Sequence, residues 1–180
     1  LNYSYRIDKS RDSSDCAYSR NIEKCYEVVD SLDSTDIQFG RYVKNSYKGS
    51  FLHDVSNSNE CFGCVNRRSA KHQIFNQQYT PERYTKELVQ YDLGSYKNFK
   101  KISIKFEEFK KTHPRKYAIL ERAINVTGDN LQDVRNSKFC FESYNLENSK
   151  FIMVGIDGVK DSYDLSYCGL GCELGYDGTS

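Results

Sequence analysis

Two pairs of cysteines have a spacing that could do chemistry. Cys61 and Cys64 form a C-x-x-C pair, and Cys168 and Cys172 form a looser pair. A structural zinc ion takes four ligands, commonly thiolates, so the two pairs together would complete a site. One C-x-x-C pair supplies only half of that set. These four residues are therefore candidate zinc ligands and zinc the candidate cofactor, but we expect the cysteines to pack and no cofactor to bind.

The way in which cysteine is used supports packing. The chain has seven cysteines, an odd number, so at least one has no partner within the chain. Cys16, Cys61 and Cys140 occupy a repeated position that Ile or Leu occupies elsewhere. Free cysteine behaves as a small apolar residue, so we expect buried, reduced thiols. The odd number and the lack of a signal peptide at the start of the sequence favour a cytoplasmic location.

Other residue types give weaker indications of catalysis. His53, His72 and His113 are scattered, and none has a nucleophile and a carboxylate at a diagnostic spacing. The aspartates fall mainly at a turn position of the repeat, where Asp bonds to its own backbone. We therefore expect no catalytic residue. A carbohydrate-active lyase or hydrolase is the enzymatic alternative, and glycoside hydrolysis would need paired acids about 5–9 Å apart.

Charge is uneven along the chain. Residues 95–116 carry eight Lys or Arg and two Glu, whereas the whole chain of 180 residues has a net charge of +1. A basic segment can bind nucleic acid, but no nucleic-acid-binding motif accompanies it. We interpret the lysines as the solvated face of a helix. No apolar run is long enough to cross a membrane.

A recurring spacing carries most of the information about the fold. Eleven segments place a small or apolar residue four positions after a polar one, often as Asn/Asp-Ser-x-x-Cys/Ile/Leu. The clearest copies end at Cys16, Ile37, Cys61, Cys140, Ile152 and Leu165, and weaker ones at Cys25, Ser46, His72, Leu131 and Leu174. Steps of nine and twelve positions combine into a repeat of about 21 residues, a length that is typical of solenoids.

We therefore predict an all-β-dominated fold, a parallel β-helix or solenoid of about 21 residues per coil with an α-helical insertion. Two strands per coil would give two facing parallel sheets, with Cys16 beside Ile37 and Leu131 beside Ile152. In this arrangement Ile37 and Phe39 share a face. The abundance of Asn, Ser, Asp and Tyr and the fifteen Tyr, ten Phe and two Pro suit short strands and tight turns.

The middle of the chain has helical signals. Thr80-Pro81-Glu82 is a helix start, with Thr as N-cap and Pro at the first helical position. A second helix is predicted from about Tyr96 to Thr112, with Pro114 ending it. Further helical turns are predicted over 117–124. The apolar stripe of the second helix, which we expect to lie on the side or end of the solenoid, consists of Phe99, Ile102, Phe106 and Phe109.

These patterns divide the sequence into three segments: a first solenoid block over 1–79, a helical insertion over 80–124 and a second block over 125–180. We expect one continuous domain, cut from a longer protein. Both ends are repeat-like, which favours self-association through the solenoid ends.

Several motifs, in order, resemble an uncharacterised Cys/Tyr-rich repeat family of metagenome-derived bacterial genomes, often named automatically as CaiB/BaiF family proteins. The motifs are Glu60–Asn66, Ile74–Tyr79, Leu93–Lys97, Asn125–Asn130 and Lys160–Asp164. The resemblance covers nearly the whole chain and implies no established activity. The sequence shows neither the strand–helix alternation nor the CoA site that the name suggests. His72 stands where that family often has cysteine.

The functional prediction is a non-enzymatic β-solenoid scaffold or binding module, whose Tyr- and Asn-rich side binds a protein or glycan partner. The first alternative is the carbohydrate-active enzyme. The second is a zinc-stabilised interaction module.

Overall fold

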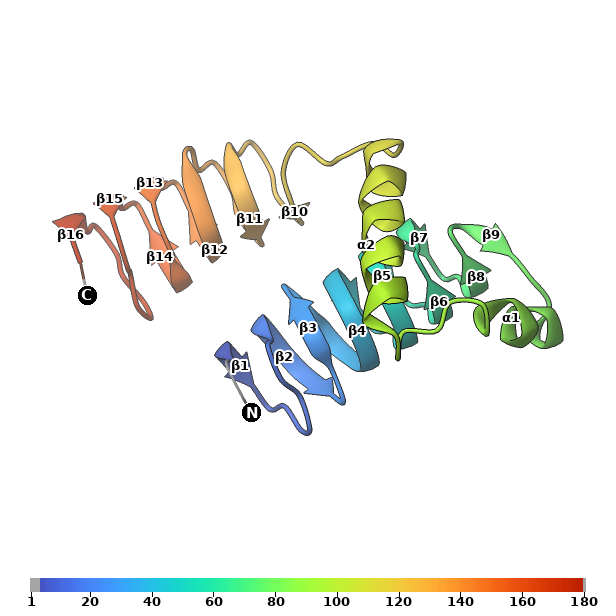
Figure 1. Cartoon of the computed structure of the whole chain (residues 1–180). Helices are drawn as coiled ribbons and strands as arrows, with labels where there is room; N and C mark the ends of the chain where they lie inside the picture. Colours follow the sequence, from blue (N-terminus) through green and yellow to red (C-terminus); the bar gives the residue numbers. More distant parts are fainter. Residues whose placement is uncertain (1–3, 180) are drawn as a thin grey trace. The chain divides into compact units, whose positions relative to one another are not determined.

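The computed structural model describes residues 4–179 and is dominated by parallel β-strands with two helices (Figure 1). Contacts group the chain into two compact units, Leu1–Pro114 and Arg115–Ser180, and each is described by itself. The helices lie in the first unit, within the segment predicted to be helical. The prediction that the chain forms one continuous domain stays a prediction.

The first unit contains one sheet of nine strands and both helices. All its strands pair in parallel except β9, which runs antiparallel to β8. The elements are β1 (Tyr5–Asp8), β2 (Ala17–Glu23), β3 (Tyr26–Val29), β4 (Leu32–Lys44), β5 (Tyr47–Ser56), β6 (Asn59–Phe62), β7 (Val65–Arg68), β8 (Lys71–Ile74), β9 (Gln77–Gln78), α1 (Pro81–Leu88) and α2 (Tyr96–Lys111).

The second unit contains two smaller parallel sheets. One has the order β10-β11-β12-β14 and the other β13-β15-β16. The strands are β10 (Leu120–Glu121), β11 (Gly128–Gln132), β12 (Cys140–Glu147), β13 (Lys150–Ile152), β14 (Ile156–Lys160), β15 (Tyr163–Leu165) and β16 (Tyr176–Gly178).

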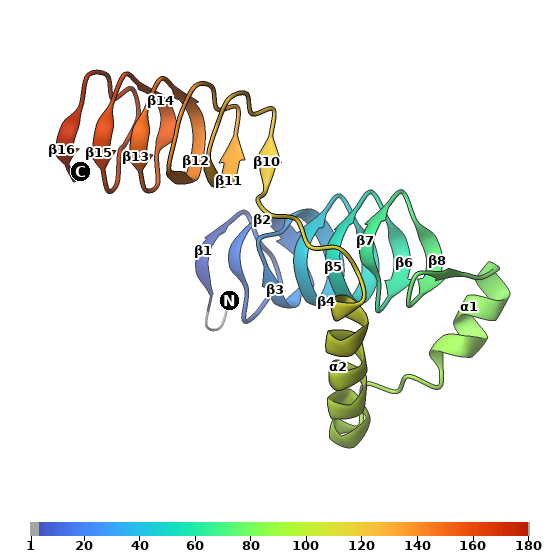
Figure 2. The same cartoon turned by 90° about the horizontal axis from the view of Figure 1, so that it is seen from above.

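Most strands pair with a segment twelve positions further along the chain, so the predicted longer repeat was wrong. Ile37 pairs with Gly49, and Gly49 pairs with Cys61. We call each such twelve-position set a rung. The residues predicted to be neighbours therefore do not pair. Ala17, next to Cys16, pairs with Val29, and Leu131 pairs with Ser143 rather than with Ile152. Figure 2 shows the rungs of each unit following one another.

Within a rung the chain turns at every third residue. The first residue of each triplet points inward, the second is extended, and the third has positive φ, as in Asn57 (φ 52°) and Glu60 (φ 52°). A left-handed residue reverses the side-chain alternation of a strand, so side chains point inward at intervals of three rather than two. Asn and Asp tolerate this conformation best, because their side chains bond locally. This tolerance explains the Asn/Asp-Ser pattern of the sequence.

Buried serines complete the hydrogen bonding of the interior. Ser46 Oγ donates to the carbonyl of Lys44 at 2.8 Å and accepts from the N–H of Ser58, one rung on, at 3.2 Å. The second and third N–H groups of a triplet bond to neighbouring rungs, as Thr35 N–H does to Ser46 C=O. The serine satisfies the remaining, inward N–H, whose burial without a partner would be costly. The same pair of bonds recurs at Ser13, Ser19, Ser31, Ser34, Ser58, Ser137, Ser143, Ser149 and Ser162.

Inward cysteines replace serine or an aliphatic residue. The Cys61 thiol donates to the carbonyl of Asn59, two residues earlier, as an inward serine does. The six clear copies of the motif, and Cys25, Ser46 and Leu131, have their predicted residue buried. The prediction was wrong at His72 and Leu174, which have positive φ and point outward. It was also wrong that Ile37 and Phe39 share a face, because they lie in different clusters.

Both predicted helices are present. Thr80 caps α1 by accepting from Arg83 N–H, and α2 spans Tyr96–Lys111. Phe106 and the rest of the predicted stripe pack on the outside of the strands, against Phe51 and Phe62. The helical turns predicted over 117–124 were wrong, because β10 lies there and Leu120 pairs with Leu131.

The last parallel rung of the first unit is closed by side-chain hydrogen bonds. Asn76 Oδ1 accepts from Val65 N–H at 2.9 Å and Asn76 Nδ2 donates to Val65 C=O at 3.0 Å. His113 contacts the same amide, which ties the end of α2 to the rung. Among the described residues no helix is long and apolar enough to span a bilayer.

Ser46→Ala should lower the free energy of unfolding of the first unit by about 1–3 kcal/mol, because it removes the acceptor of a buried N–H. Urea denaturation followed by circular dichroism measures the change. Ser46→Cys should cost less, since the sulfur is a weak acceptor for the Ser58 N–H and the thiol still donates to the carbonyl of Lys44. Ser56→Ala is the control, with an outward side chain. Equal stability of Ser46→Ala and Ser56→Ala would contradict the role of the inward hydroxyl.

Candidate functional site

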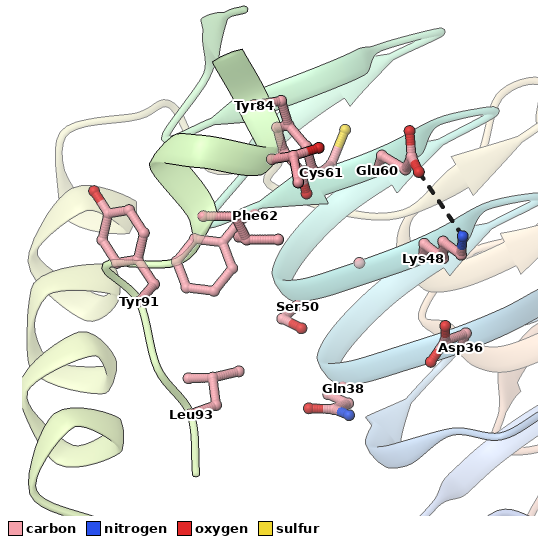
Figure 3. A pocket seen from close by; sticks show the side chains of 13 residues that line it. Asp36, Gln38, Lys48, Ser50, Glu60, Cys61, Phe62, Tyr84, Tyr91 and Leu93 are labelled. Atoms are coloured by element: carbon pink, nitrogen blue, oxygen red, sulfur yellow. Dashed lines mark ion pairs between the residues drawn. The ribbon is translucent and has the colours of Figure 1, made fainter. Parts of the chain in front are cut away.

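A groove of about 380 Å³ lies on the outside of the first unit and is the best candidate for a site (Figure 3). Strands β4, β5 and β6 form one wall. Helix α1 and the chain that follows it form the other, with Leu88, Tyr91 and Leu93. The helix start at Thr80 and the break after Leu88 position this second wall, because the chain must return along the strands before α2 begins at Tyr96.

The strand wall carries a row of charges. Asp36, Lys48 and Glu60 occupy the same left-handed position on three successive rungs, and His72 continues the row. Lys48 Nζ lies 3.9 Å from Glu60, and His72 Nε2 lies 2.7 Å from the other carboxylate oxygen of Glu60. Opposite charges alternate at the spacing of rungs, about 4.8 Å. Lys48 thus stands between two carboxylates, and His72 adds a positive charge to the row only when it is protonated.

The other part of the groove is apolar and aromatic. Phe62 is buried, and the ring of Tyr91 lies 4.7 Å from it, centroid to centroid. In Figure 3 Tyr91 and Leu93 stand on the side of the helices, across the groove from Gln38 and Ser50 on the strands. The groove therefore offers a partner an apolar wall, uncharged polar groups and a row of charges.

The floor of the groove reaches the interior at Cys61. Cys61 and Cys64 are almost fully buried, and each thiol donates to the backbone carbonyl two residues earlier. The neighbouring Cys61 thiol and burial raise the pKa of the Cys64 thiol, whereas the neighbouring Cys64 thiol lowers the pKa of Cys61. Burial also raises the pKa of Tyr84, which lies above them. A neutral phenol and a buried thiol pair make this part of the groove a packed floor with no exposed nucleophile.

The candidate zinc ligands belong to two different cores. Cys61 and Cys64 pack in the core of the first unit, and Cys168 and Cys172 in or against that of the second. Burial raises the pKa of the Cys168 thiol to about 12. Within residues 4–179, all seven cysteines are free and no group of three or more His, Cys, Asp or Glu residues is placed to hold a metal.

The three histidines have separate surroundings. His72 joins the charge row, His113 joins Asn76, and His53 lies under α2, where burial and Lys110 lower its pKa. The lysines of α2 are mostly on its outer side, although Lys105 lies over the ring of Phe75, 4.4 Å from its centroid.

No protein-family model matches the chain, and no curated protein matches it. The resemblance to the Cys/Tyr-rich repeat family stays a prediction.

Sequence reasoning missed the groove residues. A signal was present: Asp36, Lys48, Glu60 and His72 recur at equal intervals of twelve positions, and the charges of the first three alternate. Because a longer repeat was predicted, these residues were not placed in one row.

Treatment with a metal chelator should not change stability, since packing and hydrogen bonds hold the cysteines in place without a metal ion. We expect purified protein to contain well under one zinc per chain, and the thermal midpoint to be the same with and without EDTA. Elemental analysis and a melting curve measure both quantities. One zinc per chain together with a lower midpoint in EDTA would restore the zinc-stabilised module.

Proposed function

We propose that the chain is a parallel β-solenoid with coils of about twelve residues and that it acts as a non-enzymatic binding module. The register shared by most strands of both units supports the first part. A rigid stack holds each outward side chain at a fixed spacing, which preorganises a binding surface and reduces the entropy lost on binding.

The groove between β4–β6 and the chain after α1 carries the proposal. Its volume of about 380 Å³ lies in the usual range for binding sites. It combines an apolar wall at Tyr91 and Leu93 with charges at Lys48 and Glu60. Such a surface suits a short protein segment in which apolar and charged side chains alternate.

A protein partner fits the groove better than a glycan does. Sugars bind to proteins by placing their C–H faces on exposed aromatic rings. Phe62 is buried, and rings of Phe51, Phe75 and Tyr91 surround it at 4.7–6.0 Å. Its ring is therefore occupied, and it offers no flat platform to a sugar.

The proposal is tested by filling the groove. Ser50→Trp places an indole on the strand wall, and Ser56→Trp places one elsewhere on β5, outside the groove. A random peptide library displayed on phage is selected against the unaltered chain, and the affinities of enriched peptides are measured by interferometry. We expect Ser50→Trp to weaken binding at least about tenfold and Ser56→Trp to leave it unchanged. Equal binding to both variants, or no enrichment of any peptide, would refute the groove as a peptide site.

One observation favours the carbohydrate-active enzyme as a second candidate. Asp36 and Glu60 line the same groove two rungs apart, a backbone spacing of roughly 9–10 Å. Inverting glycosidases separate their carboxyl groups by about 6.5–9.5 Å to admit a water molecule. Lys48, however, stands between the two carboxylates, and Glu60 already pairs with Lys48 and His72.

A panel of soluble polysaccharides, assayed for new reducing ends, separates the two candidates. We expect no release above background, because Glu60 is held by an ion pair with Lys48 and by its contact with His72. Turnover that is lost in both Asp36→Asn and Glu60→Gln, and kept in Asp33→Asn, would establish the enzyme instead. Asp33 is a suitable control because it has positive φ, like Asp36, and lies outside the groove.

A further inference from the structure

The second unit carries a row of aromatic rings on its outer surface, which we call the ring ladder: Phe139, Phe151, Tyr163 and Tyr176. Phe139 and Phe151 stack at 5.2 Å with an angle of 13° between planes, and the ladder continues with centroid distances of 5.3 and 6.1 Å. Phe139 is 50% exposed and Phe151 40%. The adjacent side of the rungs adds Phe141 and Met153, which are also exposed and in register.

The first unit contains the same arrangement, but covered. Phe39 and Phe51 stack at 4.8 Å with 24° between planes, and both have positive φ, like Phe139 and Phe151. Helix α2 lies on this pair: Phe99 is 4.9 Å from Phe39, and Phe106 is 5.6 Å from Phe51. Phe51 is consequently only 4% exposed. In this chain, an amphipathic helix with an aromatic stripe is what covers a stacked phenylalanine pair.

Two lysines beside the ring ladder indicate which charge a helix docked there would carry along its side. Lys138 and Lys150 are in register on adjacent rungs. The Lys150 ammonium lies 4.8 Å from the centroid of Phe151 and 5.5 Å from that of Tyr163. Neither lysine has a salt bridge to a carboxylate within the described part of the chain. Two ammonium groups that border an apolar surface are complementary to carboxylates on a partner.

We propose that the ring ladder docks an amphipathic helix of a partner protein, with an aromatic stripe on Phe139 and Phe151 and carboxylates against Lys138 and Lys150. A glycan is a poorer occupant of the Phe139–Phe151 pair, because these two rings stack and each covers one face of the other. The apolar patch is also of the kind that marks protein interaction sites on soluble proteins. The docking surface is separate from the groove of the first unit and does not depend on it.

Peptides derived from α2 test the proposal. Peptide A spans residues 95–113 with its natural lysines, and in peptide B every lysine is replaced by glutamate; a hydrocarbon staple opposite the apolar stripe keeps both helical. Binding to the full chain is followed by fluorescence anisotropy. We expect peptide B to bind more tightly than peptide A, and Phe139→Ala combined with Phe151→Ala to weaken peptide B at least about tenfold. The combination Lys138→Glu and Lys150→Glu should reverse the preference in favour of peptide A.

Tyr18→Ala is the matched control, because Tyr5 and Tyr18 form an exposed ring pair on the first unit. Its binding of peptide B should equal that of the unaltered chain, and circular dichroism should show the same fold for every variant. Three results would each overturn the proposal: no binding of peptide B, binding that the Phe139 and Phe151 substitutions leave unchanged, or sedimentation showing a dimer that the same substitutions dissociate.

Discussion

The whole structure depends on satisfying one N–H group per triplet. A left-handed residue at every third position turns the chain and directs the inward N–H away from the ladder of backbone hydrogen bonds. Inward serines resolve this where they occur, in place of an apolar side chain: the hydroxyl of Ser46 donates to the carbonyl two residues earlier and accepts from the N–H group one rung on. The interior is therefore a mixture of serine with Cys, Ile, Leu and Val. A purely aliphatic interior would leave those N–H groups unpaired.

The surface follows from the same geometry. Because the rungs follow one another at a nearly constant interval in the sequence, each outward position forms a row along the stack, and residues of related character can follow one another within a row. The row with Asp36 and Glu60 alternates in charge, and the row with Phe39 and Phe51 is aromatic. The charged row lines one wall of the groove, and α2 packs on the aromatic row. Both the candidate site and the helix contact thus result from periodicity in the sequence.

The sequence was sufficient to predict the parallel β class, the helix starting at Thr80, the α2 stripe and most of the buried positions. It was not sufficient for the register. Most steps between motif copies are multiples of three, and the shorter steps, such as Cys16 to Cys25, join adjacent sides of the coil rather than the same row. Ordinary strands alternate with a period of two, so left-handed residues at Lys48 or Phe51, where Asn or Asp is absent, gave no local signal. Without the register, neither the charge row nor the groove could be assembled.

The amide of Asn76 gives the first unit a defined edge. By supplying an acceptor and a donor to the backbone of Val65, it takes the place that a peptide group of another strand would occupy. A bare β-edge invites intermolecular pairing and fibre growth. At Val65 one side chain thus takes the place of a further rung, and β9 pairs antiparallel with the other edge strand, β8, so that both stretches of backbone are engaged within the chain.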